Sequence, residues 1–214
     1  MVVLDPAHGG SDSGARGSAG TIESEVVLDF GRAIRVALEA KGFRAVLTRE
    51  GNQSPSFDDR STLINGLSDA VFVSLHVSST GPPDTARVYF CSILPAPSEA
   101  PPGPGQPPAR RPSGLIEWDR AQEPYLDSSR RLAELVQIQL ALRFQGSPET
   151  PAAAAIRQLR TVAAPAIAIE VSSVASDLSR LTQMGQPLGE ALARAAAAFQ
   201  QGLAQGAIEL GPAR

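Results

Sequence analysis

The chain is predicted to be an α/β protein: a single domain with a mostly parallel, twisted sheet of about six strands, flanked by helices on both faces. Two observations predict this class. Short runs of β-branched residues alternate with segments whose apolar residues have helical spacing, and this alternation favours a parallel sheet covered on both faces. The 214 residues are 43% hydrophobic and 19% charged, which is typical of a globular chain with a buried core.

Short runs rich in β-branched or aromatic residues predict strands at 2–4, 45–48, 71–75, 87–91 and 166–171. Helices are predicted between the strands. The first helix ends near Gly42, and its apolar face consists of Val27, Phe30, Ile34 and Leu38. The other helices are expected at 57–67, 127–144 and 188–203, with Gly185 and Pro187 at the start of the last one.

Composition excludes several classes of protein. A formal net charge of −3 and a pI near 5.5 argue against a nucleic-acid binder, which would normally carry a basic face. No run of 18 apolar residues is present, so no membrane span is expected. Met1 is followed directly by a strand run, so no signal peptide is predicted; both a domain cut from a longer precursor and a cytoplasmic protein would begin this way. The single Cys91 is expected to be a small buried core residue.

A proline-rich segment interrupts the pattern at about 94–113. Residues 95–112 hold 8 of the 18 prolines of the chain, so this stretch cannot join the interior of a sheet or helix. We expect a loop insertion on the surface. The alternative is a partner-docking site or a flap beside the active site.

The two histidines of the chain each follow a predicted strand. His8 follows the run at 2–4, and His76 follows the run at 71–75. Strand ends are where ligands bind in α/β proteins, and imidazole is a common ligand for zinc-type metals. This placement predicts that both histidines serve chemistry rather than packing.

Two carboxylates are candidates to complete such a site. Glu23 follows a glycine-rich stretch at 9–20 and opens the first helix, where it would either bind a metal or complement the helix dipole. Glu170 ends an otherwise apolar strand run. A charge there is expected to be paired, to serve as a general base beside a metal, or to reach solvent at the strand end.

The sequence resembles the zinc-dependent N-acetylmuramoyl-L-alanine amidases, which cut bacterial peptidoglycan. The opening segment 5–17, DPAHGGSDSGARG, is similar to the first motif of that family, and a Gly-x-x-Glu element matches Gly20 and Glu23. Later family elements match Leu47-Thr48-Arg49, Arg60 with Asn65, Ser74-Leu75-His76, and the segment 165–170, PAIAIE. The matches keep the family's order over nearly the whole chain outside the proline-rich segment.

The resemblance implies one Zn²⁺ per chain, bound by His8, Glu23 (rather than Glu25) and His76, with Glu170 as the catalytic base. It implies hydrolysis of the amide between the lactyl group of N-acetylmuramic acid and L-alanine, and therefore action in the periplasm or cell wall. We expect a monomer that acts on peptidoglycan, with an upstream regulatory or wall-binding domain as a possibility outside this chain. The alternatives are a weak or inactive peptidoglycan-binding module and a metallopeptidase that acts on another amide.

The chain departs from the family pattern at Ala7, which would be strained if that position needed a positive φ, and at Ser78, Ser172 and Ser173, which we expect to shape the substrate groove. Asp5 is expected either to support His8 through a hydrogen bond or to be a turn residue. Arg60 would bind a peptide carboxylate or form a structural ion pair. Asp12 and Asp29 are assigned to a turn and to a helix surface.

Overall fold

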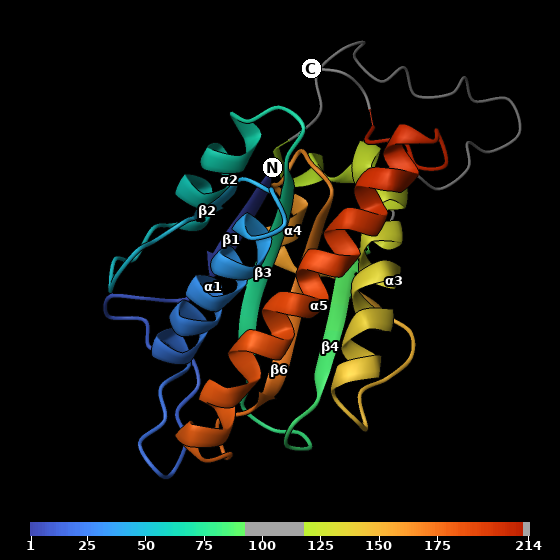
Figure 1. Cartoon of the computed structure of the whole chain (residues 1–214). Coiled ribbons are helices and arrows are strands. Elements are labelled where there is room, and N and C mark those ends of the chain that lie inside the picture. The colour runs from blue at the N-terminus through green and yellow to red at the C-terminus, as the bar shows by residue number, and fades with distance from the viewer. Residues whose placement is uncertain (93–117, 212–214) are drawn as a thin grey trace, which may run out of the picture.

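The computed structural model describes residues 1–92 and 118–211, and the predicted proline-rich insertion at 94–113 lies outside them. The predicted fold class is confirmed: a six-stranded, mostly parallel sheet lies between helices (Figure 1). The strands are β1 (Val2–Pro6), β2 (Ala45–Leu47), β3 (Val71–Ser78), β4 (Ala86–Cys91), β5 (Ala152–Ala154) and β6 (Ala166–Ser173). No helix in the described part of the chain is both long and apolar enough to cross a membrane.

The sheet has the strand order β2-β1-β3-β6-β4-β5. Strands β2, β1, β3 and β6 run parallel, whereas β4 is antiparallel to β6 and pairs with β5 in parallel. The carboxyl ends of β1, β3 and β6 therefore meet at one edge of the sheet. Strand β5 was missed by the sequence prediction because its three alanines carry no β-branched signal.

Three long helices cover one face of the sheet: α1 (Glu23–Glu39), α3 (Leu126–Arg143) and α5 (Leu178–Ala204) (Figure 1). Their apolar residues pack with Val73 and Leu75 of β3 and Ile167 and Ile169 of β6 in one large core. Two shorter helices, α2 (Phe57–Asn65) and α4 (Arg157–Arg160), lie on the other face. Short 3₁₀ helices at Trp118–Arg120 and Glu123–Tyr125 lead into α3.

Helix α5 begins ten residues earlier than predicted, and Gly185 and Pro187 lie inside it. Proline removes one backbone donor, but buried Leu181 and Leu188 hold both sides of that position against the core. The helix also packs closely on α1. A Cβ added at Gly189 would come within 2.9 Å of the Ala37 Cβ, so a glycine is needed at this approach.

The second face of the sheet is covered over only part of its length. Phe72, Ala166 and Ala168 pack in a smaller core with Ile64 of α2 and Leu159 of α4. Side chains alternate along a strand, so His76 and Glu170, near the carboxyl ends of β3 and β6, lie on this same face. Both are only partly buried. The fold therefore leaves polar side chains accessible at the carboxyl edge.

Candidate metal centre

Three predicted ligands meet at the carboxyl edge of the sheet: His8 follows β1, Glu23 opens α1, and His76 lies in β3. His8 Nε2 is 3.2 Å from Glu23 Oε1, and His76 Nδ1 is 3.0 Å from the same oxygen. One ligand atom from each residue lies within 4.8 Å of the other two. The structure therefore brings together the three side chains that the sequence singled out.

Backbone donors fix the carboxylate of Glu23. Its Oε2 accepts a hydrogen bond from the Ala15 N–H at 2.7 Å, and its Oε1 accepts one from the Val77 N–H at 3.1 Å. The Glu23 side chain is only 5% exposed. The glycine-rich loop and β3 thus hold a buried carboxylate between the two imidazoles.

His8 itself has the unusual backbone conformation at the end of β1, with φ of +64°. Ala7 is not among the residues with positive φ, so the strain considered at that position does not arise there. The His8 ring is held by Asp12, whose Oδ2 lies 2.9 Å from Nδ1. Asp12 was assigned only to a turn, although its position four residues after His8, across two glycines, could have suggested this contact.

The charges of the three residues are strongly coupled. The hydrogen bond to Glu23 raises the pKa of His8 to about 8, against the opposing effect of burial. Burial works to raise the pKa of Glu23, but hydrogen bonds from His76, His8 and Ala15 outweigh it and leave that pKa well below its usual range. The buried carboxylate is therefore ionised and favours a positive charge between the two imidazoles.

Asp5 lies within β1 rather than in a turn, and the partners of its carboxylate do not include His8, so the structure agrees with neither of the two expectations. Its buried carboxylate accepts hydrogen bonds from Thr48 Oγ1 at 2.6 Å and Ser74 Oγ at 3.0 Å, and it pairs with Arg60. Ser74 Oγ in turn lies 3.4 Å from His76 Nε2. Asp5 is thus connected to the second histidine, through Ser74, rather than to the first.

Arg60 has a structural role instead of an open binding position. Its side chain is 5% exposed, pairs with Asp5, and donates to the backbone oxygens of Pro6 and His8. Asn65, from the same sequence element, donates to the Thr161 oxygen and accepts from the Ala163 N–H. This element therefore ties α2 to β1 and to the segment before β6.

Glu170 lies beside His76, because the two residues are paired in the register of β3 and β6. The Tyr89 hydroxyl donates a hydrogen bond of 3.0 Å to Glu170 Oε2. Burial and the Glu170 charge raise the pKa of Tyr89, which keeps its phenol protonated as a donor. The sequence analysis missed Tyr89; it lies two residues from Arg87, which pairs with Glu170 across the antiparallel strands.

The serines at the departures from the family pattern lie next to Glu170. The β3–β6 register shifts after Val77, so that Ser78 pairs with Ser173, and Ser172 has φ of +47°. The Ser172 hydroxyl accepts from the Asp84 N–H, and Ser78 Oγ donates to the Thr80 oxygen. Ser78 and the buried Ser172 line the cavity beside Glu170, whereas Ser173, which is also buried, does not.

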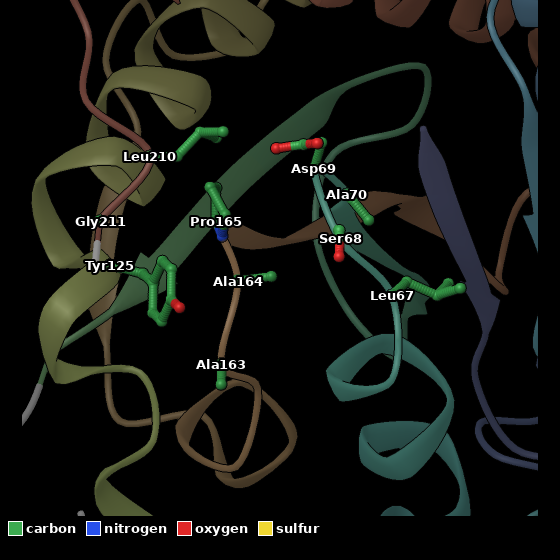
Figure 2. A pocket seen from close by; sticks show the side chains of 10 residues that line it. All are labelled: Leu67, Ser68, Asp69, Ala70, Tyr125, Ala163, Ala164, Pro165, Leu210 and Gly211. Carbon is green, nitrogen blue, oxygen red and sulfur yellow. The ribbon is translucent and has the colours of Figure 1, made fainter. Parts of the chain in front are cut away.

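Two cavities open on either side of the site. A metal-side cavity of about 280 Å³ is lined by His8, His76 and the first turn of α2, including Phe57. A base-side cavity of about 340 Å³ is lined by Glu170, Tyr89, Arg87 and the segment after β3. A third cavity, of about 330 Å³, lies at the opposite edge of the sheet, between the segments that precede β3 and β6 (Figure 2).

The donor set fits a zinc-type ion. Two imidazoles and one carboxylate form a recurring set of protein ligands at catalytic zinc sites, where a fourth position stays open. The Glu23 oxygen that faces both rings belongs to a buried, ionised carboxylate, and Asp12 and Ser74 contact the other nitrogens of the two rings. Such outer contacts orient metal-binding histidines.

Residues 2–197 match the family model described as N-acetylmuramoyl-L-alanine amidase. The chain belongs to this amidase family. The AmiA amidase of Escherichia coli is 37% identical over 86 residues, which are 40% of this chain and 30% of AmiA. The LytC amidase of Bacillus subtilis is 25% identical over 186 residues, which are 85% of this chain and 31% of LytC. The chain thus spans about a third of the length of these curated relatives.

Solved amidases have the same fold. The amidase AmiC2 of Nostoc punctiforme is 26% identical with a TM-score of 0.68, over 94% of this chain and 96% of that one. An amidase from Clostridium difficile 630 also superimposes with a TM-score of 0.68, at 20% identity, over 94% and 96% of the two chains. The sheet and helices described above are therefore those of an amidase domain.

Proposed function

We propose that this amidase domain is a zinc-dependent hydrolase of the amide between the lactyl group of N-acetylmuramic acid and L-alanine in peptidoglycan. The observation that carries the proposal is the cluster of His8, Glu23 and His76 with Glu170 on the neighbouring strand. This pairing supplies a cation site and a carboxylate side by side at an open sheet edge. Membership of the amidase family supports the choice of substrate.

His8, Glu23 and His76 would hold the zinc ion through the atoms that face one another in the cluster. A bound zinc ion supplies a Lewis acid that polarises the scissile carbonyl and lowers the pKa of water. Asp12 orients the His8 ring, and the chain of hydrogen bonds from Asp5 through Ser74 reaches the His76 ring. These contacts keep both imidazoles turned toward Glu23.

Glu170 moves the proton. It accepts a proton from the attacking water and returns it to the nitrogen of the departing L-alanine, as a general base and then a general acid. Tyr89 is a positioning residue, because its hydroxyl donates a hydrogen bond to Glu170 Oε2. The products are a glycan with a free lactyl carboxylate and a peptide with a free L-alanine amine.

The substrate sets the expected location and partners. Peptidoglycan lies outside the inner membrane, so we place the activity in the periplasm or cell wall. We further propose that the domain acts as a monomer, without nucleic acid. A regulatory or wall-binding domain elsewhere in a longer protein would fit relatives that are about three times as long as the matched segments.

The test combines metal content with analysis of the new end groups. Zinc-loaded protein should release free L-alanine amino termini from purified sacculi, and chelation should stop the release until zinc is added back. Glu170→Gln should keep its zinc and lose hydrolysis by about 10²–10⁴-fold. New termini other than L-alanine would indicate a peptidase, and zinc-independent binding without cleavage would indicate a wall-binding module. Either result would overturn the proposal.

A further inference from the structure

The base-side cavity contains one cation, Arg87, to which the reaction described above assigns no contact with the substrate. Among the residues that line this cavity, Arg87 is the only basic side chain and Glu170 the only acidic one. Arg87 is exposed, and within the described residues it forms no ion pair. An exposed arginine that faces a cavity without an acidic partner is suited to bind a carboxylate of a ligand.

A purely structural explanation would pair Arg87 with Glu170, because the two residues lie opposite each other in the antiparallel pair β4–β6. The structure does not favour this pairing. Glu170 Oε2 accepts a hydrogen bond from Tyr89 instead, and no ion pair joins Glu170 to Arg87 in the described structure. Arg87 also interacts with the Tyr89 hydroxyl. A guanidinium has five N–H donors, so this one contact leaves donors for an anion that enters the cavity.

If the proposed function holds, the order of the strands indicates how the substrate lies across the carboxyl edge of the sheet. The metal ligands lie on the β1 and β3 side, Glu170 follows on β6, and Arg87 lies one strand further on β4. Glu170 must reach the leaving nitrogen, so the stem peptide begins at Glu170. The peptide then continues toward β4, and the sugar occupies the metal-side cavity with Phe57.

The distance from Glu170 to Arg87 matches the second residue of the stem peptide. Neighbouring strands are about 4.8 Å apart, and an extended peptide advances roughly 3.3–3.6 Å for each residue. One strand beyond Glu170 therefore corresponds to between one and two residues beyond the scissile nitrogen. In peptidoglycan this second residue is a γ-linked D-glutamate, whose α-carboxyl group is either free or amidated.

We infer that Arg87 binds the free α-carboxylate of the second stem residue and makes the domain prefer non-amidated stem peptides. This inference rests on the proposed function, because it uses the position of the leaving nitrogen. A charged hydrogen-bonded pair of this kind corresponds to a preference of about tenfold or more. Amidation removes the negative charge and replaces one of the two acceptor oxygens by an NH2 group, so the bidentate pair with the guanidinium is lost.

The experiment compares two defined substrates, N-acetylmuramoyl-L-alanyl-D-isoglutamate and N-acetylmuramoyl-L-alanyl-D-isoglutamine. The zinc-loaded wild-type domain should cleave the first with a kcat/KM about tenfold higher. Arg87→Gln should bring the ratio close to one, mainly by slowing cleavage of the isoglutamate compound, and Arg87→Glu should reverse the preference. The matched control Arg44→Gln removes an exposed cation just before β2, at the opposite edge of the sheet, and should keep the wild-type ratio.

A wild-type ratio near one would overturn the inference, as would an unchanged ratio in Arg87→Gln. Equal slowing of the cleavage of both substrates in Arg87→Gln would also overturn it, because that result would mean that Arg87 acts through Glu170 rather than by binding the peptide. If neither compound were cleaved, the proposed function would fail. Calorimetric titration of each compound into the Glu170→Gln variant would then still show whether Arg87 binds the α-carboxylate. The inference is supported if Glu170→Gln binds the isoglutamate compound more tightly than the isoglutamine compound and the double variant Glu170→Gln/Arg87→Gln does not. Equal binding of the two compounds to Glu170→Gln contradicts it.

Discussion

The two edges of the sheet have cavities of similar size but different chemistry. At the carboxyl edge, cavities of about 280 and 340 Å³ are lined by both histidines, Glu170 and Arg87. At the amino edge, a cavity of about 330 Å³ is lined mostly by apolar residues, among them three alanines, Leu67, Pro165 and Leu210, and Asp69 is its one acidic residue (Figure 2). Cavity volume therefore does not locate the functional site, whereas converging titratable side chains do.

Coverage by the short helices explains the difference. Helices α2 and α4 pack over Phe72 and Ala166, which lie near the amino ends of β3 and β6. The same helices leave His76 and Glu170 partly exposed further along those strands. Polar residues at the carboxyl ends can therefore meet a substrate without being buried, as is general for open α/β sheets.

The largest expected effect comes from removing the carboxylate of the cluster. Glu23→Gln should abolish stoichiometric zinc binding and hydrolysis, because the buried oxygen that faces both imidazoles loses its charge. Glu25→Gln, two residues away and exposed, is the matched control and should keep both. Elemental analysis of the purified variants checks the prediction. Zinc retained by Glu23→Gln would remove this residue from the ligand set.

A smaller effect is expected at Asp12, and it sharpens the contrast between the edges. Asp12→Asn should weaken zinc binding by about tenfold, because the carboxylate that orients His8 loses its charge. Asp69→Asn, at the amino edge, should leave zinc affinity and kcat unchanged. Competition with a chromogenic chelator measures the affinities. Equal losses in the two variants would mean that net charge, rather than the contact with His8, sets the affinity.

Tyr89→Phe should lower kcat by several-fold to tenfold and leave the zinc content and KM nearly unchanged. The hydroxyl positions Glu170 without touching the metal cluster, and a hydrogen bond to a charged group is worth about 1.5–3 kcal/mol. Steady-state kinetics on a defined muropeptide separates the two parameters. Unchanged kcat would show that Glu170 is held in place by other contacts.

The smallest effect is expected at the amino edge, where Cys91 is buried in the smaller core. Burial raises the pKa of its thiol to about 11. A raised folded pKa stabilises the protein below the unfolded value of about 8.5–9, and this contribution is lost as the pH rises toward 11. Between pH 8 and pH 10 the wild-type protein should lose about 1 kcal/mol more stability than Cys91→Ala in urea unfolding. An equal loss in both proteins would contradict this assignment.

The sequence predicted the parts of the fold and site that are encoded by local pattern. The strand runs and the two histidines at their ends were recognisable because burial and parallel pairing require continuous apolar runs. Strand β5 and the early start of α5 were missed, because alanines give no strand signal and core packing on both sides tolerates Pro187. Local pattern is weakest where tertiary contacts decide the outcome.

In the site, too, the residues could be predicted from local sequence patterns, whereas most of their contacts depend on tertiary structure. His8, Glu23 and His76 were identified from strand ends and from resemblance, and the structure brings them together. The contact of Asp12 with His8 forms through a left-handed turn, for which the two glycines after His8 were the only sequence signal. The role of Tyr89 depends on the register of β4 against β6, which no single-sequence pattern encodes. Asp5 and Arg60 were recognised as candidates, and their buried ion pair gives Arg60 a structural role, whereas Asp5 also reaches His76 through Ser74.

The central claim is that one zinc ion binds between His8, Glu23 and His76 at the carboxyl edge of the sheet. Anomalous diffraction at the zinc edge from crystals of the zinc-loaded protein tests it most directly. We expect one strong peak per chain, with ligand distances of about 2.0–2.2 Å to two imidazole nitrogens and one Glu23 oxygen. A peak at other residues, or no peak in protein that hydrolyses peptidoglycan, would contradict the account.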